Sequence, residues 1–239
     1  MSQRALAENE IWDFVKDYAT AAKNAIDAGF DGVEIHGANG FLVDQFLQDM
    51  CNKRTDAWGG SVARRARFAL EVTKAVVEAI GANKTAMRLS PWNTYQGMGM
   101  VDPMPQFAFV VQELKKLKLA YLHLVESRVQ SNEDAESTGT NDFLIDIWTE
   151  SPLLLAGGFN AESAKTCVDE QYRHGDIAIV FGRYFTRNPD LPFRIQKGIE
   201  FEPYNRNTFY NAKSPDGYID YQFSKQFIHE NHQFRSAKI

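Results

Sequence analysis

Five short apolar runs alternate with helical patterns along the chain, and this alternation restricts the fold more than any other feature. The runs are FDGVEIH (30–36), TAMRLSP (85–91), AYLHLVE (120–126), PLLLAGG (152–158) and IAIVFGR (177–183). Apolar residues at helical spacing predict helices over 9–28, 61–80, 105–117, 141–149, 161–172 and 188–198. Because parallel strands need crossover helices, we expect consecutive parallel βα units.

Two α/β architectures share this order of elements, an open doubly wound sheet and a (β/α)8 TIM barrel. No GxGxxG motif follows the first strand, which disfavours the dinucleotide-binding form of the open sheet. A barrel places its chemistry at the carboxyl ends of its strands, where polar residues and glycines are expected. The predicted strand ends carry His36, Arg88, Glu126, Gly157, Gly158, Gly182 and Arg183. The sequence therefore favours a TIM-barrel-type fold.

The number of predicted strands is smaller than a closed barrel requires. Such a barrel has eight strands and about 250 residues, whereas about five βα units are visible in the 239 residues of this chain. We expect an incomplete barrel that forms a single partial domain over residues 1–239, with an irregular tail from about residue 200. The remaining strands would belong to another chain or to a longer ancestor, and an open sheet stays the alternative.

Composition excludes several classes of function. The chain has 26 basic and 31 acidic residues and a formal net charge of −5, so no basic surface for nucleic acid is expected. No run of about 18 apolar residues exists, which predicts no membrane span. Cys51 and Cys167 stand far apart, and the N-terminus has no apolar signal segment. We expect reduced thiols in a cytoplasmic protein.

The stretch VEIHGANGF, residues 33–41, places His36 and Asn39 just beyond a predicted strand. A spacing of three in a turn or a first helical turn lets both side chains face one ligand atom. Two donors on a carbonyl oxygen stabilise the charge that develops there during addition to a conjugated carbonyl. The structural alternative is that His36 only caps the strand and Asn39 only forms an Asx-turn.

Two glycine-containing turns, AGGF (156–159) and FGRYF (181–185), end consecutive predicted strands. Glycine lets backbone N–H groups approach a phosphate, and Arg183 could contact it in a bidentate manner, which favours a phosphate site over plain tight turns.

Arg88 offers a cation for a phosphate or an anionic ring. No strand ends in a lysine for a Schiff base, and GxSxG and HExxH motifs are missing. No metal site is expected.

Six segments in order give the chain a specific resemblance from about residue 4 to residue 221. They are GFDGVEIHGANGFLVDQFLQD, NKRTDAWGGSVARRARFALEV, MRLSPW, AYLHLVESR, LLAGGF and VFGRYFTRNPDLPFRIQKGIEFEPYNRNTFY. Together they resemble the old yellow enzyme family of FMN-dependent ene-reductases. Within that family the chain is most similar to the fungal branch that acts on chanoclavine-I aldehyde, a branch with reductase and isomerase forms.

The resemblance implies a (β/α)8 barrel with FMN at its mouth and NADPH as reductant. It implies that His36 and Asn39 hold the carbonyl oxygen of an enal or enone, and that Arg88 contacts the flavin ring. Further implied roles are the FMN phosphate region for Gly158, Gly182 and Arg183, and the substrate pocket for Tyr95 and Tyr210. The chain starts where the third helix of the family would start, so the resemblance also implies N-terminal truncation.

Phe41 departs from the family pattern, which usually has tyrosine there to give a proton to the α-carbon. Phenylalanine cannot act as a general acid, so the resemblance favours isomerisation over net reduction, in fungal alkaloid-type metabolism. The alternative for Phe41 is simple packing, with another group as the acid.

Other functions stay open beside this hypothesis. They are an NADPH-dependent ene-reductase, a flavin-independent isomerase or cyclase, and an inactive fragment or partner of a full-length homologue. An oligomer or a complementing chain is the expected partner class.

Overall fold

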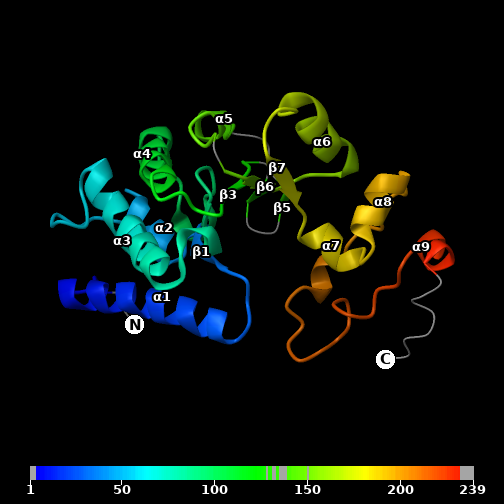
Figure 1. Cartoon of the computed structure of the whole chain (residues 1–239), viewed down its shortest axis with the longest axis horizontal. Helices are drawn as coiled ribbons and strands as arrows, with labels where there is room; N and C mark the ends of the chain where they lie inside the picture. The colour runs from blue at the N-terminus through cyan, green and yellow to red at the C-terminus, as the bar shows by residue number, and fades with distance from the viewer. Residues whose placement is uncertain (1–3, 128, 131–132, 135–138, 150, 232–239) are drawn as a thin grey trace. The chain divides into compact units, whose positions relative to one another are not determined.

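The chain folds into two compact units, Met1–Ile179 and Val180–Ile239, which are described separately. The computed structural model describes residues 4–127, 129–130, 133–134, 139–149 and 151–231 (Figure 1). Our expectation of a single partial domain over residues 1–239 stays a prediction.

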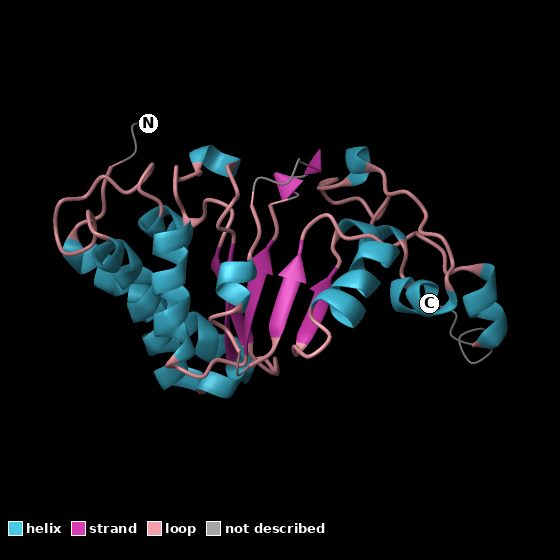
Figure 2. Cartoon of the chain, turned by 90° about the horizontal axis from the view of Figure 1, so that it is seen from above, coloured by secondary structure: helices cyan, strands magenta, loops and turns pink. Residues whose placement is uncertain are grey.

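The first unit contains the parallel sheet that the sequence predicts. Its strands are β1 (Val33–Gly37), β2 (Thr85–Leu89), β3 (Tyr121–Val125), β6 (Leu153–Ala156) and β7 (Ile177–Val180), hydrogen-bonded in the order β1-β2-β3-β6-β7. The pairs β1–β2, β2–β3 and β3–β6 are parallel. Figure 2 shows the strands of this sheet running in one direction. A separate antiparallel pair joins β4 (Val129–Gln130) and β5 (Glu133–Asp134).

In the first unit one helix precedes β1, and the other helices lie between strands in sequence. The helices of this unit are α1 (Glu8–Asp27), α2 (Leu42–Leu47), α3 (Val62–Ile80), α4 (Met104–Lys115), α5 (Asp142–Ile145) and α6 (Ala161–Thr166), with a π-helical turn at Cys167–Gln171 and 3-10 turns at Ala82–Lys84 and Tyr95–Gly97. In α3 the Ser61 hydroxyl accepts the Arg64 N–H, so Ser61 is the N-cap that the sequence predicts. The sequence did not predict α2, and α5 and α6 are shorter than expected.

The core of the first unit lies on one face of the sheet. Alternate residues of β1, β2, β3 and β6 supply its buried apolar side chains, and the main examples are Ile35, Met87, Leu89, Leu122, Leu124, Leu153 and Leu155. Helices α1 to α4 group beside the strands in Figure 1, and α3 contacts α1, α2, α4 and β2. Apolar residues of α3 at helical spacing, such as Phe68, Val72 and Val76, are buried as the pattern predicts.

The second unit contains α7 (Arg183–Arg187), α8 (Leu191–Lys197), a 3-10 turn at Arg206–Thr208 and α9 (Lys225–Glu230). Arg194 and Asp190 form a buried ion pair of 2.8 Å at the start of α8. The segment beyond residue 200, which we expected to be irregular, includes only the short turn and α9 as helical elements among its described residues.

None of the helices in the described part of the chain is long and apolar enough to cross a membrane.

Candidate active site

Three polar side chains occupy one row across neighbouring strands. The register pairs His36 with Arg88 and Arg88 with His123. Side chains of paired residues in a parallel sheet project to the same face, and successive residues alternate between faces. His36, Arg88 and His123 therefore share the face opposite the apolar core. Nothing in the sequence singled out His123, because it stands inside an apolar run.

Glu34 and Tyr121 form a second polar layer two residues earlier on the same face. Glu34 Oε2 lies 2.9 Å from His123 Nδ1. Burial by itself would raise the pKa of Glu34, but hydrogen bonds from His123 and Tyr121 and the charge of Arg88 outweigh burial and lower this pKa. Burial and the Glu34 carboxylate raise the pKa of Tyr121 to about 12. Glu34 is therefore an anion at neutral pH, and Tyr121 keeps its proton.

The row of His36, Arg88 and His123 contains buried nitrogen atoms that have no hydrogen-bond partner among the described residues. They are His36 Nδ1, Arg88 Nε and His123 Nε2. Leaving a buried polar atom unpaired costs about 1–3 kcal/mol, so such atoms mark places where another group supplies the hydrogen-bond partner. Burial and the nearby Arg88 charge lower the pKa of His36. His36 is thus a neutral imidazole with one N–H to donate.

Asn39 follows β1 in a turn whose geometry is fixed by the segment after β2. Its φ of 57° lies in the left-handed region, so the helical-turn form of our prediction is wrong and the turn form holds. The Asn39 N–H donates to Ser90 Oγ at 2.8 Å. The Asn39 side-chain oxygen accepts a hydrogen bond from Asn93 Nδ2 at 2.8 Å. The Asn39 side-chain oxygen thus bonds to a residue far away in the sequence, and not to the nearby backbone as in an Asx-turn.

Phe41 stands at the N-cap of α2 and is 51% exposed. Its ring centroid lies 4.7 Å from that of His36, so the phenyl group borders the imidazole. Behind the turn, the Gly40 N–H donates to the fully buried carboxylate of Asp44 at 2.9 Å. Burial raises the pKa of Asp44 to about 6. Asp44 could not be singled out from the sequence, because α2 was not predicted.

Tyr95, predicted as a wall of the substrate pocket, lies in the same segment that holds Asn39. Its backbone N–H donates to Asn93 Oδ1 at 2.6 Å, and its side chain is 43% exposed. The structure therefore brings Tyr95 to the neighbourhood of the turn. Tyr210 belongs to the second unit and is 90% exposed, so its part in the pocket stays a prediction.

The residues predicted for the phosphate region are divided between the two units. Gly158, with a φ of 66°, follows β6 in the first unit. Gly182 and Arg183 start α7 in the second unit, where Arg183 Nη1 donates to the Tyr204 hydroxyl at 2.9 Å. The Arg183 guanidinium also stacks over the Tyr204 ring, 5.2 Å from its centroid. The convergence of these residues on one phosphate stays a prediction.

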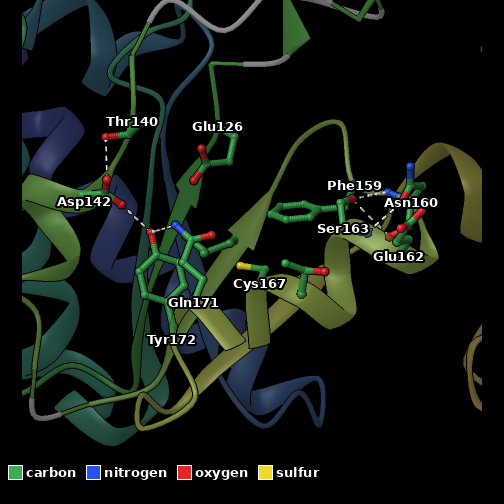
Figure 3. A pocket seen from close by; sticks show the side chains of 12 residues that line it. Glu126, Thr140, Asp142, Phe159, Asn160, Glu162, Ser163, Cys167, Gln171 and Tyr172 are labelled. Carbon is green, nitrogen blue, oxygen red and sulfur yellow. Dashed lines mark hydrogen bonds between the residues drawn. The ribbon is translucent and has the colours of Figure 1, made fainter. Parts of the chain in front are cut away.

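A cavity of about 490 Å³ that the sequence did not indicate lies beyond the ends of β3 and β6 (Figure 3). Glu126, Asp142, Phe159, Cys167 and Tyr172 are among its lining residues. In Figure 3 the Tyr172 hydroxyl points to Asp142, to which it donates a hydrogen bond. Burial and this carboxylate raise the pKa of Tyr172 well above its usual range.

Comparison with known proteins identifies the family. Residues 1–202 match the NADH:flavin oxidoreductase / NADH oxidase family. The chain belongs to this family. It is 57% identical over 225 residues to a chanoclavine-I aldehyde reductase of Penicillium roqueforti (strain FM164), covering 94% of this chain and 61% of that protein. A probable inactive reductase of Epichloe festucae var. lolii is 49% identical over 236 residues, with 95% and 62% covered.

Solved structures place the fold. The crystal structure of Old Yellow Enzyme from Pichia sp. AKU4542 matches with a TM-score of 0.83 and 42% identity, over 93% of this chain and 57% of that one. The predicted resemblance to old yellow enzymes and the incomplete TIM-barrel fold are thereby confirmed. The chain spans about three fifths of the length of the relatives that it matches.

The polar face fits the pyrimidine end of a flavin ring, which presents oxygen and nitrogen acceptors. Arg88 Nε is buried and unpartnered within the described residues, so an acceptor on this face would satisfy it. Burial also lowers the pKa of Arg88, although the charge of Glu34 opposes this effect. The guanidinium still stays charged at neutral pH. The donor set on this face therefore agrees with the family's cofactor.

Proposed function

We propose that this chain is an FMN-dependent oxidoreductase that acts on the conjugated double bond of an α,β-unsaturated aldehyde or ketone, in fungal alkaloid-type metabolism. The observation that carries the proposal is the row of His36, Arg88 and His123, whose buried nitrogens lack partners in the described part of the chain. Membership of a flavin oxidoreductase family supports it, as does the similarity to a chanoclavine-I aldehyde reductase.

Arg88 is proposed to hold the flavin ring, and Gly158, Gly182 and Arg183 its phosphate. When bound, FMN reduced by NADPH supplies a hydride to the β-carbon of the substrate. Tyr95 and Tyr210 are proposed to line the pocket around the substrate.

His36 and Asn39 are proposed to hold the substrate carbonyl oxygen. The lowered pKa of His36 keeps the imidazole neutral, so it acts as a hydrogen-bond donor and not as a proton source. Asn39 adds an amide donor. Negative charge builds on the carbonyl oxygen when the β-carbon is attacked, and preorganised donors stabilise it by several kcal/mol.

Phe41 is proposed to decide whether the reaction ends in isomerisation or in net reduction. Its side chain cannot protonate the α-carbon, so the enolate held by His36 and Asn39 persists while the bond between the α- and β-carbons rotates. Bound FMN would take the hydride back, which would restore the double bond in the other geometry. No net reduction takes place, and NADPH is needed only to prime the flavin.

The test uses citral, an enal supplied as separate E and Z isomers. The wild-type chain with FMN and NADPH is expected to interconvert the isomers, whereas Phe41→Tyr is expected to raise the share of citronellal, the reduced product. Phe41→Leu serves as the matched control, because it changes the ring but adds no hydroxyl. An equal share of citronellal from wild type and Phe41→Tyr would refute the proton-donor argument.

A second candidate is that the chain acts together with a polypeptide that supplies further strands of the barrel. Two observations favour it: the sheet has five strands among the described residues, and the chain covers 61% of the P. roqueforti reductase. The part of that reductase outside the match can be expressed and mixed with the chain. Turnover by the mixture and not by the chain alone would support this candidate, and equal turnover of both would refute it.

A further inference from the structure

The segment after β2 uses three of the four hydrogen-bonding positions of Asn39. Ser90 Oγ accepts its backbone N–H at 2.8 Å, and Gln96 Nε2 donates to its backbone carbonyl at 3.0 Å. Asn93 Nδ2 donates to its side-chain Oδ1 at 2.8 Å. The fourth position, the Asn39 Nδ2 amino group, has no acceptor among the residues that the structure describes.

The orientation of the two side-chain amides follows from one backbone group. A side-chain amide has an acceptor end and a donor end that look alike in shape, so its partners decide which end is which. The backbone N–H of Tyr95 can only donate, and it points to Asn93 at 2.6 Å. The atom that it meets must therefore be Asn93 Oδ1. The other end of Asn93, which meets Asn39, must be the donor.

We propose that Asn93 is a positioning residue that holds the Asn39 amide with its donor turned outward, toward the substrate. This inference rests on the proposed function, in which Asn39 binds a carbonyl oxygen. A carbonyl oxygen can only accept, so an Asn39 amide in the opposite orientation would repel it. Asn93 is 5% exposed and Ser90 is fully buried, so water competes little for these contacts.

The same contacts link the donor to the wall of the pocket. Asn93 Oδ1 fixes the backbone of Tyr95, and Asn93 Nδ2 fixes the side chain of Asn39. Gly40 lies against this segment as well, since a Cβ there would meet Gln96 Cβ at 2.7 Å. The buried Asn93 side chain therefore sets both the orientation of the Asn39 amide and the position of Tyr95.

The decisive variant is Asn93→Asp, which keeps the shape and the acceptor for the Tyr95 N–H but replaces the amino group with an oxygen. The Asn39 amide is then expected to rotate by half a turn and donate to the new carboxylate. Its oxygen would face the substrate. Gln96→Ala is the matched control, because Gln96 contacts only the backbone carbonyl of Asn39 and does not set its amide.

Hydrogen exchange of the side-chain amides, followed by NMR on chain with ¹⁵N-labelled asparagine, reads the orientation without flavin or substrate. In wild type we expect slow exchange for Asn93 Nδ2 and fast exchange for Asn39 Nδ2. In Asn93→Asp the Asn39 signal should become slow, and in Gln96→Ala both should stay as in wild type. Slow exchange of Asn39 Nδ2 in wild type would overturn the inference, even if Asn93→Asp does not fold.

Binding of cinnamaldehyde, a simple enal, provides the second readout. Loss of one outward donor should weaken its binding by about tenfold to a hundredfold in Asn93→Asp. Unchanged binding together with unchanged exchange would overturn the inference. If wild type shows the expected exchange but binds no cinnamaldehyde, the amide orientation is supported and the proposed carbonyl-binding function fails.

Discussion

The two faces of the sheet use the same three strands for different purposes. On one face Ile35, Met87 and Leu122 are buried and apolar. On the other face, one residue along each strand, His36, Arg88 and His123 carry buried nitrogens without partners in the described residues. Because side chains alternate at every residue, a strand can build the core and the site at once.

The difference between the faces shows how the site is held in place. The apolar face is satisfied by packing within the first unit, and its contribution to stability is independent of pH. The polar face depends on hydrogen bonds and charge, as the Glu34–His123 pair shows. Substitutions on the apolar face should therefore affect the whole fold, and substitutions on the polar face should act through pH or through a ligand.

The largest effect is expected on the apolar face. Leu122→Ala should lower the free energy of unfolding by about 2–5 kcal/mol, because it leaves a cavity among fully buried side chains. Leu154→Ala is the matched control, since Leu154 pairs with His123 on the other face and is only half-buried. Urea unfolding measures both. An equal loss in the two variants would contradict the distinction between the faces.

Asp44, behind the turn that carries Asn39, should cause a pH dependence of stability. Its pKa is raised from 3.8 to about 6 in the folded chain, so folding favours the protonated form. This contribution is complete below about pH 4 and is lost as pH rises through 6. The stability of wild type relative to Asp44→Asn should thus fall by about 2–3 kcal/mol between pH 4 and pH 7.

Urea unfolding of both chains at several pH values measures this difference. The subtraction removes the titration of the other carboxylates. A difference that stays constant with pH would show that Asp44 is not the buried acid behind the turn.

The contribution of Glu34 to stability should depend on pH in the opposite direction. The folded chain lowers its pKa, so its contribution is present above its ordinary pKa and is lost as pH falls through the lowered value. Glu34→Gln keeps the shape but removes the charge opposite His123, and it should cost about 1 kcal/mol at pH 7. The cost should shrink toward pH 3 in the same unfolding experiment. A cost that grows on acidification would be inconsistent with an ionised Glu34.

Phe41→Tyr should have the smallest effect on stability, within about 0.5 kcal/mol, because the side chain is half exposed. Thermal unfolding checks this, with Phe41→Leu as the comparison. A large loss of stability would mean that Phe41 serves mainly as packing, and its proposed effect on the citral products would then need another explanation.

The sequence predicted the parts of the fold that depend on local pattern. The five strands, the Ser61 cap and the long helices follow from apolar spacing, and the structure confirms them. It missed α2, because six residues after a glycine turn show too little periodicity to separate a helix from a loop.

The site was predictable only in part. His36 and Asn39 could be singled out because they follow a strand and lie close together in sequence. Asn93 and Ser90 could not, because they reach Asn39 across 54 and 51 residues through contacts that no local pattern encodes. His123 was hidden for a similar reason, since its role depends on register with Arg88 on the neighbouring strand.

A fluorescence titration of FMN with purified chain shows whether the polar face holds FMN. We expect quenching of the flavin fluorescence and flavin that stays with the protein on desalting, both weakened in Arg88→Leu. Flavin that remains free, with the chain alone and with the complementing segment of the P. roqueforti reductase added, would contradict this expectation.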